Sequence, residues 1–168
     1  METGSVTHKI IVAGIGPGNP AYLLPKAQNT IANARILVGG RRALEDFAHP
    51  AAKTCAIGAD IPGVLAFIRE SLAADDVVVM VSGDPGYYSL LDALRRTFPL
   101  DQIEVIPGIS SLQLAFSRLA LPWYNARLLS FHGREPLPEE LFRAPGAVLG
   151  MLTDGWNNSQ TIAERLLS

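Results

Sequence analysis

The chain has 168 residues and a formal net charge of −2, and 48% of its residues are hydrophobic while 18% are charged. This length allows one large core, or one domain with part of a second, and the composition excludes a disordered chain. The near-neutral charge argues against a nucleic-acid-binding protein, because such proteins carry a basic footprint.

Cys55 is the single cysteine, which excludes an intrachain disulfide and a multi-cysteine metal site; we expect it to be a small buried apolar residue. His8, His49 and His132 lie far apart and lack metal-ligand spacing, so we expect no metal bound by the protein. Residues 1–8 lack a signal-peptide pattern, and no apolar run approaches the roughly 18 residues that span a membrane. We therefore expect a cytoplasmic protein without membrane contact.

The first predicted strand, residues 9–15, is apolar without alternation, as is typical of a strand buried on both faces. It runs into the turn GIGPGN at 14–19, in which Asn19 stands where a dinucleotide fingerprint has its third glycine. The second strand, 35–38, is followed by GGRR at 39–42 and lacks the acidic residue that would hold a ribose. These departures argue against a Rossmann NAD site, and the P-loop motif is also absent.

Helices and strands then alternate. The pattern predicts helices over 25–33, 41–47 and 61–73 and a strand over 53–57. Arg41 and Arg42 begin the second of these helices, where an adjacent charged pair is either solvated or forms a clamp for carboxylates.

The stretch VVVMVSGDPGYYS at 77–89 organises the chain. Residues 77–81 predict a buried parallel strand, and ligands of open α/β sheets bind at the carboxyl ends of such strands. Gly83 permits close backbone approach in the following loop, and Asp84 places one carboxylate there. Two interpretations of Asp84 stay open: a ligand-binding carboxylate, or a cap of the following helix, predicted over 87–98.

A further strand is predicted at 103–106, and it ends in PGISS at 107–111 before a helix at 112–119. Ser110 and Ser111 are explained equally well as helix caps. Three glycine-containing loops nevertheless follow three strands of one α/β pattern. We expect these loops to gather along one edge of the sheet.

Leu121-Pro122 marks a predicted domain boundary, which gives an N-terminal α/β domain at 1–121 and the start of a second at 122–168. In the second domain the pattern predicts strands over 127–131 and 147–153 and a helix over 161–167. The fold class is therefore α/β with a parallel sheet.

Three segments in this order, AGIGPGNP at 13–20, VSGDPGYYS at 81–89 and VIPGISS at 105–111, resemble the tetrapyrrole (corrin and porphyrin) methylase family. Within it, the segments at 36–47 and 107–123, together with SFHGREP at 130–136, are most similar to the precorrin C5-methyltransferases of cobalamin biosynthesis. The resemblance covers the chain from Lys9 onward. It implies two α/β domains, S-adenosylmethionine as the methyl donor in a cleft between them, and usually a homodimer.

The resemblance also implies site residues. The positions at which family members contact the donor correspond to Gly14, Gly16, Pro17, Gly83, Asp84, Tyr87, Ser110 and Ser111. A further contact corresponds to Leu152, or to Met151 if the alignment is shifted by one residue. Arg41, Arg42 and Arg134, with Arg127 as a further candidate, are expected to bind the carboxylates of an anionic corrin substrate. Tyr87 is a candidate for steering the donor, and His132 for removing the C5 proton or binding a carboxylate, unless His132 is an ordinary surface histidine.

Several alternatives stay open. The family's second domain is comparable in size to its first, so residues 122–168 predict an incomplete second domain. A sibling methylase would keep the donor loops and act on uroporphyrinogen III, a diphthamide precursor or RNA, although the charge argues against RNA. A non-catalytic nucleotide-binding module, working with a partner that methylates C15 and decarboxylates, would bind the donor without turnover. The resemblance implies cobalt-precorrin-7 or precorrin-6 as the substrate of a C5 reaction.

Overall fold

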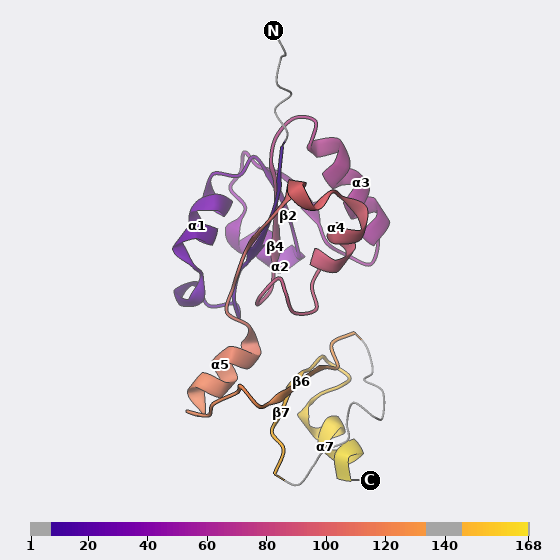
Figure 1. Cartoon of the computed structure of the whole chain (residues 1–168). Helices are drawn as coiled ribbons and strands as arrows, with labels where there is room; N and C mark the ends of the chain where they lie inside the picture. The colour runs from indigo at the N-terminus through magenta and orange to yellow at the C-terminus, as the bar shows by residue number, and fades with distance from the viewer. Residues whose placement is uncertain (1–7, 134–145, 168) are drawn as a thin grey trace. The chain divides into compact units, whose positions relative to one another are not determined.

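The computed structural model describes residues 8–133 and 146–167, and the chain divides into two compact units, Met1–Ser110 and Ser111–Ser168 (Figure 1). The division falls before α5 (Ser111–Arg118) instead of at the predicted boundary after Leu121. The reason is packing, since α5 lies against β7 (Leu149–Leu152), and a Cβ built on Gly150 would be 3.0 Å from the Phe116 ring.

The first unit contains a five-stranded sheet in the order β3-β2-β4-β1-β5, and every pairing in it is parallel. Its strands are β1 (Ile10–Gly14), β2 (Ile36–Gly39), β3 (Lys53–Ala56), β4 (Val77–Val81) and β5 (Ile103–Ile106). Its helices are α1 (Pro25–Ala32), α2 (Arg41–Phe47), α3 (Ile61–Ser71) and α4 (Leu91–Thr97), with short 3-10 turns at Pro20–Tyr22 and Leu100–Gln102. The predicted α/β class with a parallel sheet is confirmed.

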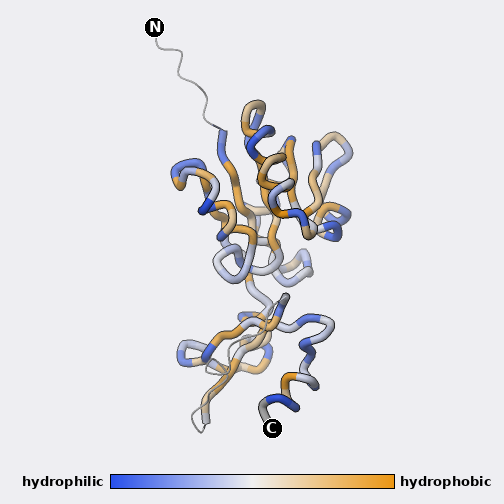
Figure 2. Tube along the Cα trace, turned by 90° about the vertical axis from the view of Figure 1, so that its right-hand side faces the viewer, coloured by the Kyte–Doolittle hydropathy of each residue, from blue (hydrophilic) through white to orange (hydrophobic). Residues whose placement is uncertain are grey.

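Strand β4 lies in the middle of this sheet and is buried along its whole length, as its run of apolar residues predicts. Alternate side chains point to opposite faces. Val79 packs with Ile68 of α3 and Leu94 of α4 on one face, and Met80 packs with Ile31 of α1 on the other. Helices therefore cover both faces, and the strands form the hydrophobic interior of the unit (Figure 2).

Helix α4 differs from its prediction, because it begins at Leu91 and not at Tyr87. Tyr88 has a φ of 51°, which is outside the right-handed helical region and ends any helix that includes it. Ser89 then stabilises the late start: its Oγ accepts a hydrogen bond from the Leu91 amide at 3.1 Å and donates one to the Pro85 carbonyl at 2.5 Å.

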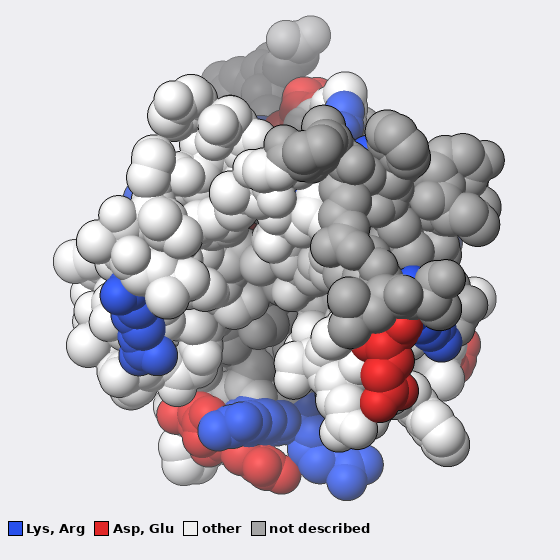
Figure 3. Space-filling model, turned by 90° about the horizontal axis from the view of Figure 1, so that it is seen from below, with Lys and Arg blue, Asp and Glu red and all other residues white. Residues whose placement is uncertain are grey.

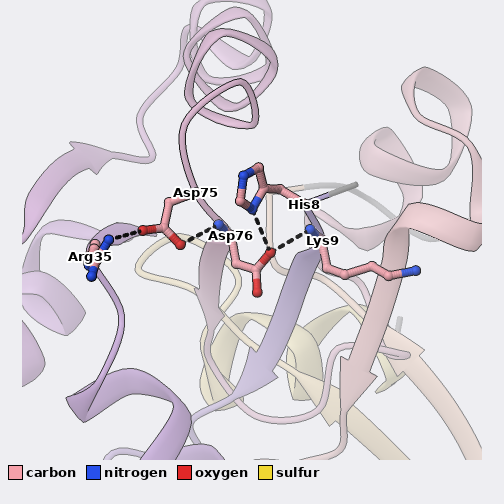
Figure 4. Close-up of polar contacts among 5 residues, drawn as sticks. All are labelled: His8, Lys9, Arg35, Asp75 and Asp76. Atoms are coloured by element: carbon pink, nitrogen blue, oxygen red, sulfur yellow. Dashed lines mark hydrogen bonds and ion pairs between the residues drawn. The ribbon is translucent and has the colours of Figure 1, made fainter. Parts of the chain in front are cut away.

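Charged side chains join the strands at the amino end of the sheet (Figure 4). Asp76 Oδ1 accepts a hydrogen bond from the Lys9 amide at 2.8 Å and lies 3.4 Å from His8 Nδ1. Asp75 accepts one from the Asp76 amide at 2.8 Å and pairs with Arg35 Nη1 at 3.1 Å. These groups are partly to mostly exposed to solvent, so each ion pair contributes modestly to stability.

The second unit pairs β6 (Arg127–Ser130) with β7 in parallel, and it also contains α5 and α7 (Ser159–Leu167). Leu129, Phe131 and Ile162 are buried in it. The predicted strands and final helix are confirmed in kind, and β6 and β7 are each shorter than expected. Over residues 8–133 and 146–167, no helix is both long enough and apolar enough to cross a membrane.

Candidate functional site

The loops that follow β1 and β4 pair with each other directly beyond the carboxyl ends of these strands. The Ile15 amide donates to the Val81 carbonyl at 2.9 Å, which extends the sheet by one residue. Beyond it, Gly16 and Gly83 exchange two backbone hydrogen bonds, of 3.3 and 2.9 Å, as an antiparallel bridge. Both glycines have a positive φ, of 71° and 69°, a conformation in which other residues are strained.

The loop after β5 packs against this pair so closely that only glycine fits. A Cβ built on Gly108 would lie 2.2 Å from the Gly83 carbonyl oxygen and 2.9 Å from the Gly14 Cα. A Cβ on Gly14 would lie 2.7 Å from the Gly108 amide nitrogen. The three loops expected at one sheet edge therefore meet backbone to backbone. We call the contact of Gly14, Gly83 and Gly108 the glycine junction.

Asp84 connects two of these loops through its carboxylate. Oδ1 accepts the Gly86 amide at 2.8 Å within its own loop, and Oδ2 accepts the Gly108 amide at 3.0 Å from the loop after β5. The interpretation of Asp84 as a cap of the following helix is wrong, because α4 begins only at Leu91. Gly108 is not among the predicted site residues, although a Pro-Gly pair directly after a strand was a usable signal in the sequence.

Tyr87, Tyr88 and Ser110 complete the surroundings of the junction in the first unit. The Tyr87 and Tyr88 rings pack edge to face, with centroids 4.7 Å apart and an interplanar angle of 76°. Tyr87 and Ser110 are half-buried, and a Cβ on Gly83 would lie 3.5 Å from the Ser110 Cα. The structure thus brings together six of the predicted donor residues, namely Gly14, Gly16, Gly83, Asp84, Tyr87 and Ser110, and Pro17 directly follows Gly16.

Apart from Arg41 and Arg42, the other predicted site residues lie in the second unit or outside the described part. Ser111 begins α5 and Leu152 ends β7. His132 is exposed after β6, and its Nδ1 lies 3.2 Å from the Thr153 carbonyl oxygen. Arg134 falls outside the described residues.

The Asp154 carboxylate, which no sequence motif indicated, holds together the two strand-end loops of the second unit. It accepts backbone amides from Asn157 at 2.7 Å, Trp156 at 2.9 Å and Gly133 at 3.0 Å. Hydrogen bonds from the amides of Asn157 and Gly133 lower the pKa of the Asp154 carboxyl, because they favour its charged form. Its position just after a strand, two residues before an exposed Trp156, gave no comparable signal in the sequence.

The model of the family Tetrapyrrole (Corrin/Porphyrin) Methylases matches residues 9–168. The chain belongs to the tetrapyrrole methylase family. The resemblance seen in the sequence is confirmed, and the loops that carry it are the ones that meet at the glycine junction.

Two relatives of known name within the tetrapyrrole methylases are similar to most of this chain. A cobalt-precorrin-7 C(5)-methyltransferase of Salmonella typhimurium is 31% identical over 159 residues, 95% of this chain and 78% of that protein. A probable cobalt-precorrin-7 C(5)-methyltransferase of Methanocaldococcus jannaschii is 33% identical over 129 residues, 75% of this chain and 61% of that protein. The chain thus spans about three fifths to four fifths of the length of these relatives.

One similar solved structure is that of a tetrapyrrole methylase with a bound ligand. The uroporphyrin-III C-methyltransferase from Thermus thermophilus, in complex with S-adenosylhomocysteine, matches with a TM-score of 0.65 and 25% identity. The match covers 95% of this chain and 71% of that one.

The two arginines of the predicted substrate site are exposed on the first turn of α2, directly after the carboxyl end of β2. Arg41 and Arg42 therefore lie at the same edge of the sheet as the three methylase loops, although β2 is separated from β1 by β4. On the face drawn in Figure 3, one basic group stands apart at the left, and other basic side chains lie beside acidic ones.

The sequence predicts a buried, apolar Cys55 and no metal bound by the protein. Burial raises the pKa of the Cys55 thiol, and this half-buried residue lies on the edge strand β3, away from the junction. Within the described ranges 8–133 and 146–167, no three side chains of His, Cys, Asp or Glu are grouped so that they could hold a metal ion.

Proposed function

We propose that this chain is an S-adenosylmethionine-dependent methyltransferase that methylates C5 of a corrin precursor, cobalt-precorrin-7 or precorrin-6, in cobalamin biosynthesis. The observation that carries the proposal is the identity of 31–33% to relatives with this C5 activity in their names, over 75–95% of the chain. Because the chain spans only part of those relatives, its activity and its substrate are part of the proposal.

The methyl donor is proposed to bind at the carboxyl ends of β1, β4 and β5, and the residues present there fit an adenosyl group. Glycine backbone can approach such a ligand closely, Ser110 offers a hydroxyl, and the Tyr87–Tyr88 pair offers apolar ring surface. When bound, S-adenosylmethionine supplies a methyl group already activated by a positively charged sulfur. The contributions of Pro17, Ser111 and Leu152 stay predictions.

The chain's own residues have mainly to position the reactants and exclude water, because the donor is already activated. Such positioning can contribute roughly 7 kcal/mol or more to catalysis. Tyr87 is proposed to steer the donor, and His132 to accept the C5 proton or bind a substrate carboxylate. Arg41, Arg42 and Arg134 are proposed to bind the remaining carboxylates, for which the planar guanidinium is well suited.

A sibling activity is the second candidate. The Thermus protein with a similar fold is named for uroporphyrin III, so transfer to that acceptor is a specific alternative. The two are separated by offering methyl-labelled S-adenosylmethionine with either acceptor and following the label. Label on C5 of the corrin precursor supports the proposal, whereas label on uroporphyrinogen III supports the sibling. Donor binding without transfer to either supports a non-catalytic module.

The first test is calorimetric titration of the full chain with S-adenosylhomocysteine. Separate titrations with NADH and ATP test whether the chain binds another nucleotide instead. Selective binding of S-adenosylhomocysteine is expected, and Ser110→Ala should weaken it while Ser117→Ala, at an exposed serine of α5, should not. Binding of NADH in its place would contradict the methylase proposal.

The substrate site is tested separately. Arg41→Ala and Arg42→Ala should raise the KM for the corrin precursor while leaving the affinity for S-adenosylhomocysteine unchanged. Arg96→Ala, at an exposed arginine in the last turn of α4, is the matched control. An unchanged KM in both variants would mean that the pair is only solvated.

Three further features belong to this proposal. We expect a homodimer, which sedimentation velocity of the chain would detect, and a cytoplasmic location. A separate enzyme for C15 methylation and decarboxylation is the expected functional partner.

A further inference from the structure

The Asp84 carboxylate has both of its oxygens engaged by backbone amides from two different loops. Oδ1 accepts the Gly86 amide at 2.8 Å, and Oδ2 accepts the Gly108 amide at 3.0 Å. We propose that Asp84 is a positioning residue, which fixes the 107–110 loop against the 83–86 loop and acts on the methyl donor through this geometry, not by direct contact.

The loop that contains Gly108 needs the hydrogen bond to Asp84 because of where it lies. A Cβ on Gly108 would lie 2.2 Å from the Gly83 carbonyl oxygen, so these two backbones are at their closest approach. The Gly108 amide points at Asp84, and without that acceptor a half-buried donor would lose its partner. Hydrogen bonds to a charged acceptor are stronger than neutral ones, and an amide left without a partner is costly.

The consequence reaches Ser110, two residues beyond Gly108. A Cβ on Gly83 would lie 3.5 Å from the Ser110 Cα, so the position of Ser110 depends on how closely the two loops approach. Ser110 is one of the residues proposed to bind the donor. Asp84 therefore sets the geometry of a donor-binding residue on a loop that it does not belong to.

Asp76, at the opposite end of β4, provides a matched control. Its carboxylate also accepts a backbone amide from another segment, that of Lys9 at 2.8 Å. There, however, the two segments are already joined by the neighbouring ladder bond from the Val77 amide to the Lys9 carbonyl at 2.9 Å. Losing Asp76 should therefore free no loop.

The decisive experiment is hydrogen exchange, followed by mass spectrometry, on the ligand-free full chain and its Asp84→Asn, Asp84→Ala and Asp76→Asn variants. Exchange in both segments 83–88 and 105–110 should rise at least threefold in Asp84→Ala and less in Asp84→Asn, since asparagine keeps one acceptor oxygen. Asp76→Asn should leave both segments unchanged. Unchanged exchange at 105–110 in Asp84→Ala would overturn the proposal, because a pure ligand contact has no effect without the ligand.

The second arm rests on the proposed function and measures affinity for S-adenosylhomocysteine. About tenfold weaker binding is expected for Asp84→Asn, equivalent to about 1.4 kcal/mol, with a larger loss for Asp84→Ala and none for Asp76→Asn. Weaker binding with unchanged exchange would show direct contact and overturn the inference. If the wild-type chain does not bind S-adenosylhomocysteine, the proposed function fails while the exchange arm still decides the role of Asp84. Should Asp84→Ala not fold, Asp84→Asn decides both arms.

Discussion

The two units hold their strand-end loops together with the same arrangement. In the first unit Asp84 follows β4 and accepts one amide from its own loop and one from Gly108, after β5. In the second unit Asp154 follows β7 and accepts two amides from its own loop and one from Gly133, after β6. Each carboxylate thus joins the end of its own strand to a glycine that follows another strand.

The surroundings of the two glycines differ. Gly108 is enclosed by Gly14 and Gly83 with no room for a Cβ, whereas a Cβ on Gly133 would have no atom within 4 Å. In the first unit, close packing at Gly108 and the Asp84 carboxylate therefore both hold the loops in place. In the second unit, the Asp154 carboxylate holds them without close packing at Gly133. Redundant constraints of this kind are expected where a site must be held in one geometry.

Gly108→Ala should give the largest effect. The added methyl group overlaps backbone on two sides, and backbone cannot move as freely as a side chain, so we expect a loss of about 3 kcal/mol in unfolding free energy. Binding of S-adenosylhomocysteine should fall with it. Urea unfolding and calorimetry measure the two quantities.

The matched control is Gly133→Ala, at the corresponding glycine of the second unit. There the space is open and the only cost is the positive φ of 66°, about 1 kcal/mol. Equal losses at the two glycines would contradict the distinction between a packed and an open loop.

Polar side chains just before α4 and α7, the helices that follow β4 and β7, should give intermediate and similar effects. Ser89 accepts the amide of Leu91 at the start of α4, and Asn158 accepts the amides of Gln160 and Thr161 at the start of α7. Replacing either residue by alanine should cost about 1 kcal/mol, measured by urea unfolding. Ser159→Ala, at an exposed neighbouring position, should change stability by less than about 0.5 kcal/mol. Strongly unequal losses would show that one unit does not depend on this side-chain bond to its helix start.

The lowered pKa of Asp154 should make the free energy of unfolding depend on pH. The pKa of its carboxyl group is lowered in the folded chain. As pH falls below the pKa of an unfolded aspartate, about 3.9, the unfolded state therefore binds more protons than the folded state. The stabilisation is complete above that value and is lost as pH falls through the folded pKa. Unfolding of wild type and Asp154→Asn at pH 7 and at pH 3 should therefore show a smaller acid loss in the variant. Parallel losses would mean that the carboxylate is not stabilised by its amides.

The sequence predicted the sheet and the meeting of the three loops well, for physical reasons. Unbroken apolar runs such as 77–81 occur where both faces of a strand are covered, and parallel strands bring their carboxyl ends to one edge. The start of α4 was wrong because Tyr87 and Tyr88 suit a helix, while the positive φ of Tyr88 is imposed by the loop.

Contacts between residues distant in the sequence could not be predicted from local patterns. The Asp84–Gly108 bond joins residues 24 positions apart, and the bond from Gly133 to Asp154 joins residues 21 apart. Each glycine looks like an ordinary turn residue until its partner is known. The division at Ser110 was missed for the same reason, since only packing shows that α5 belongs with β7.

The smallest effect is expected at the amino end of the first sheet, where side chains and not loop backbone make the contacts. The Arg35–Asp75 pair spans 3.1 Å, but the Arg35 side chain is 84% exposed, so solvent screens most of the attraction. A double-mutant cycle with Arg35→Ala and Asp75→Ala should give a coupling energy of about 0.3 kcal/mol, which falls further in 0.5 M salt. Affinity for S-adenosylhomocysteine should not change in either variant, because the pair lies at the opposite ends of the strands from the glycine junction. A coupling above about 1 kcal/mol, or altered donor binding, would show that the two ends of the sheet are not independent.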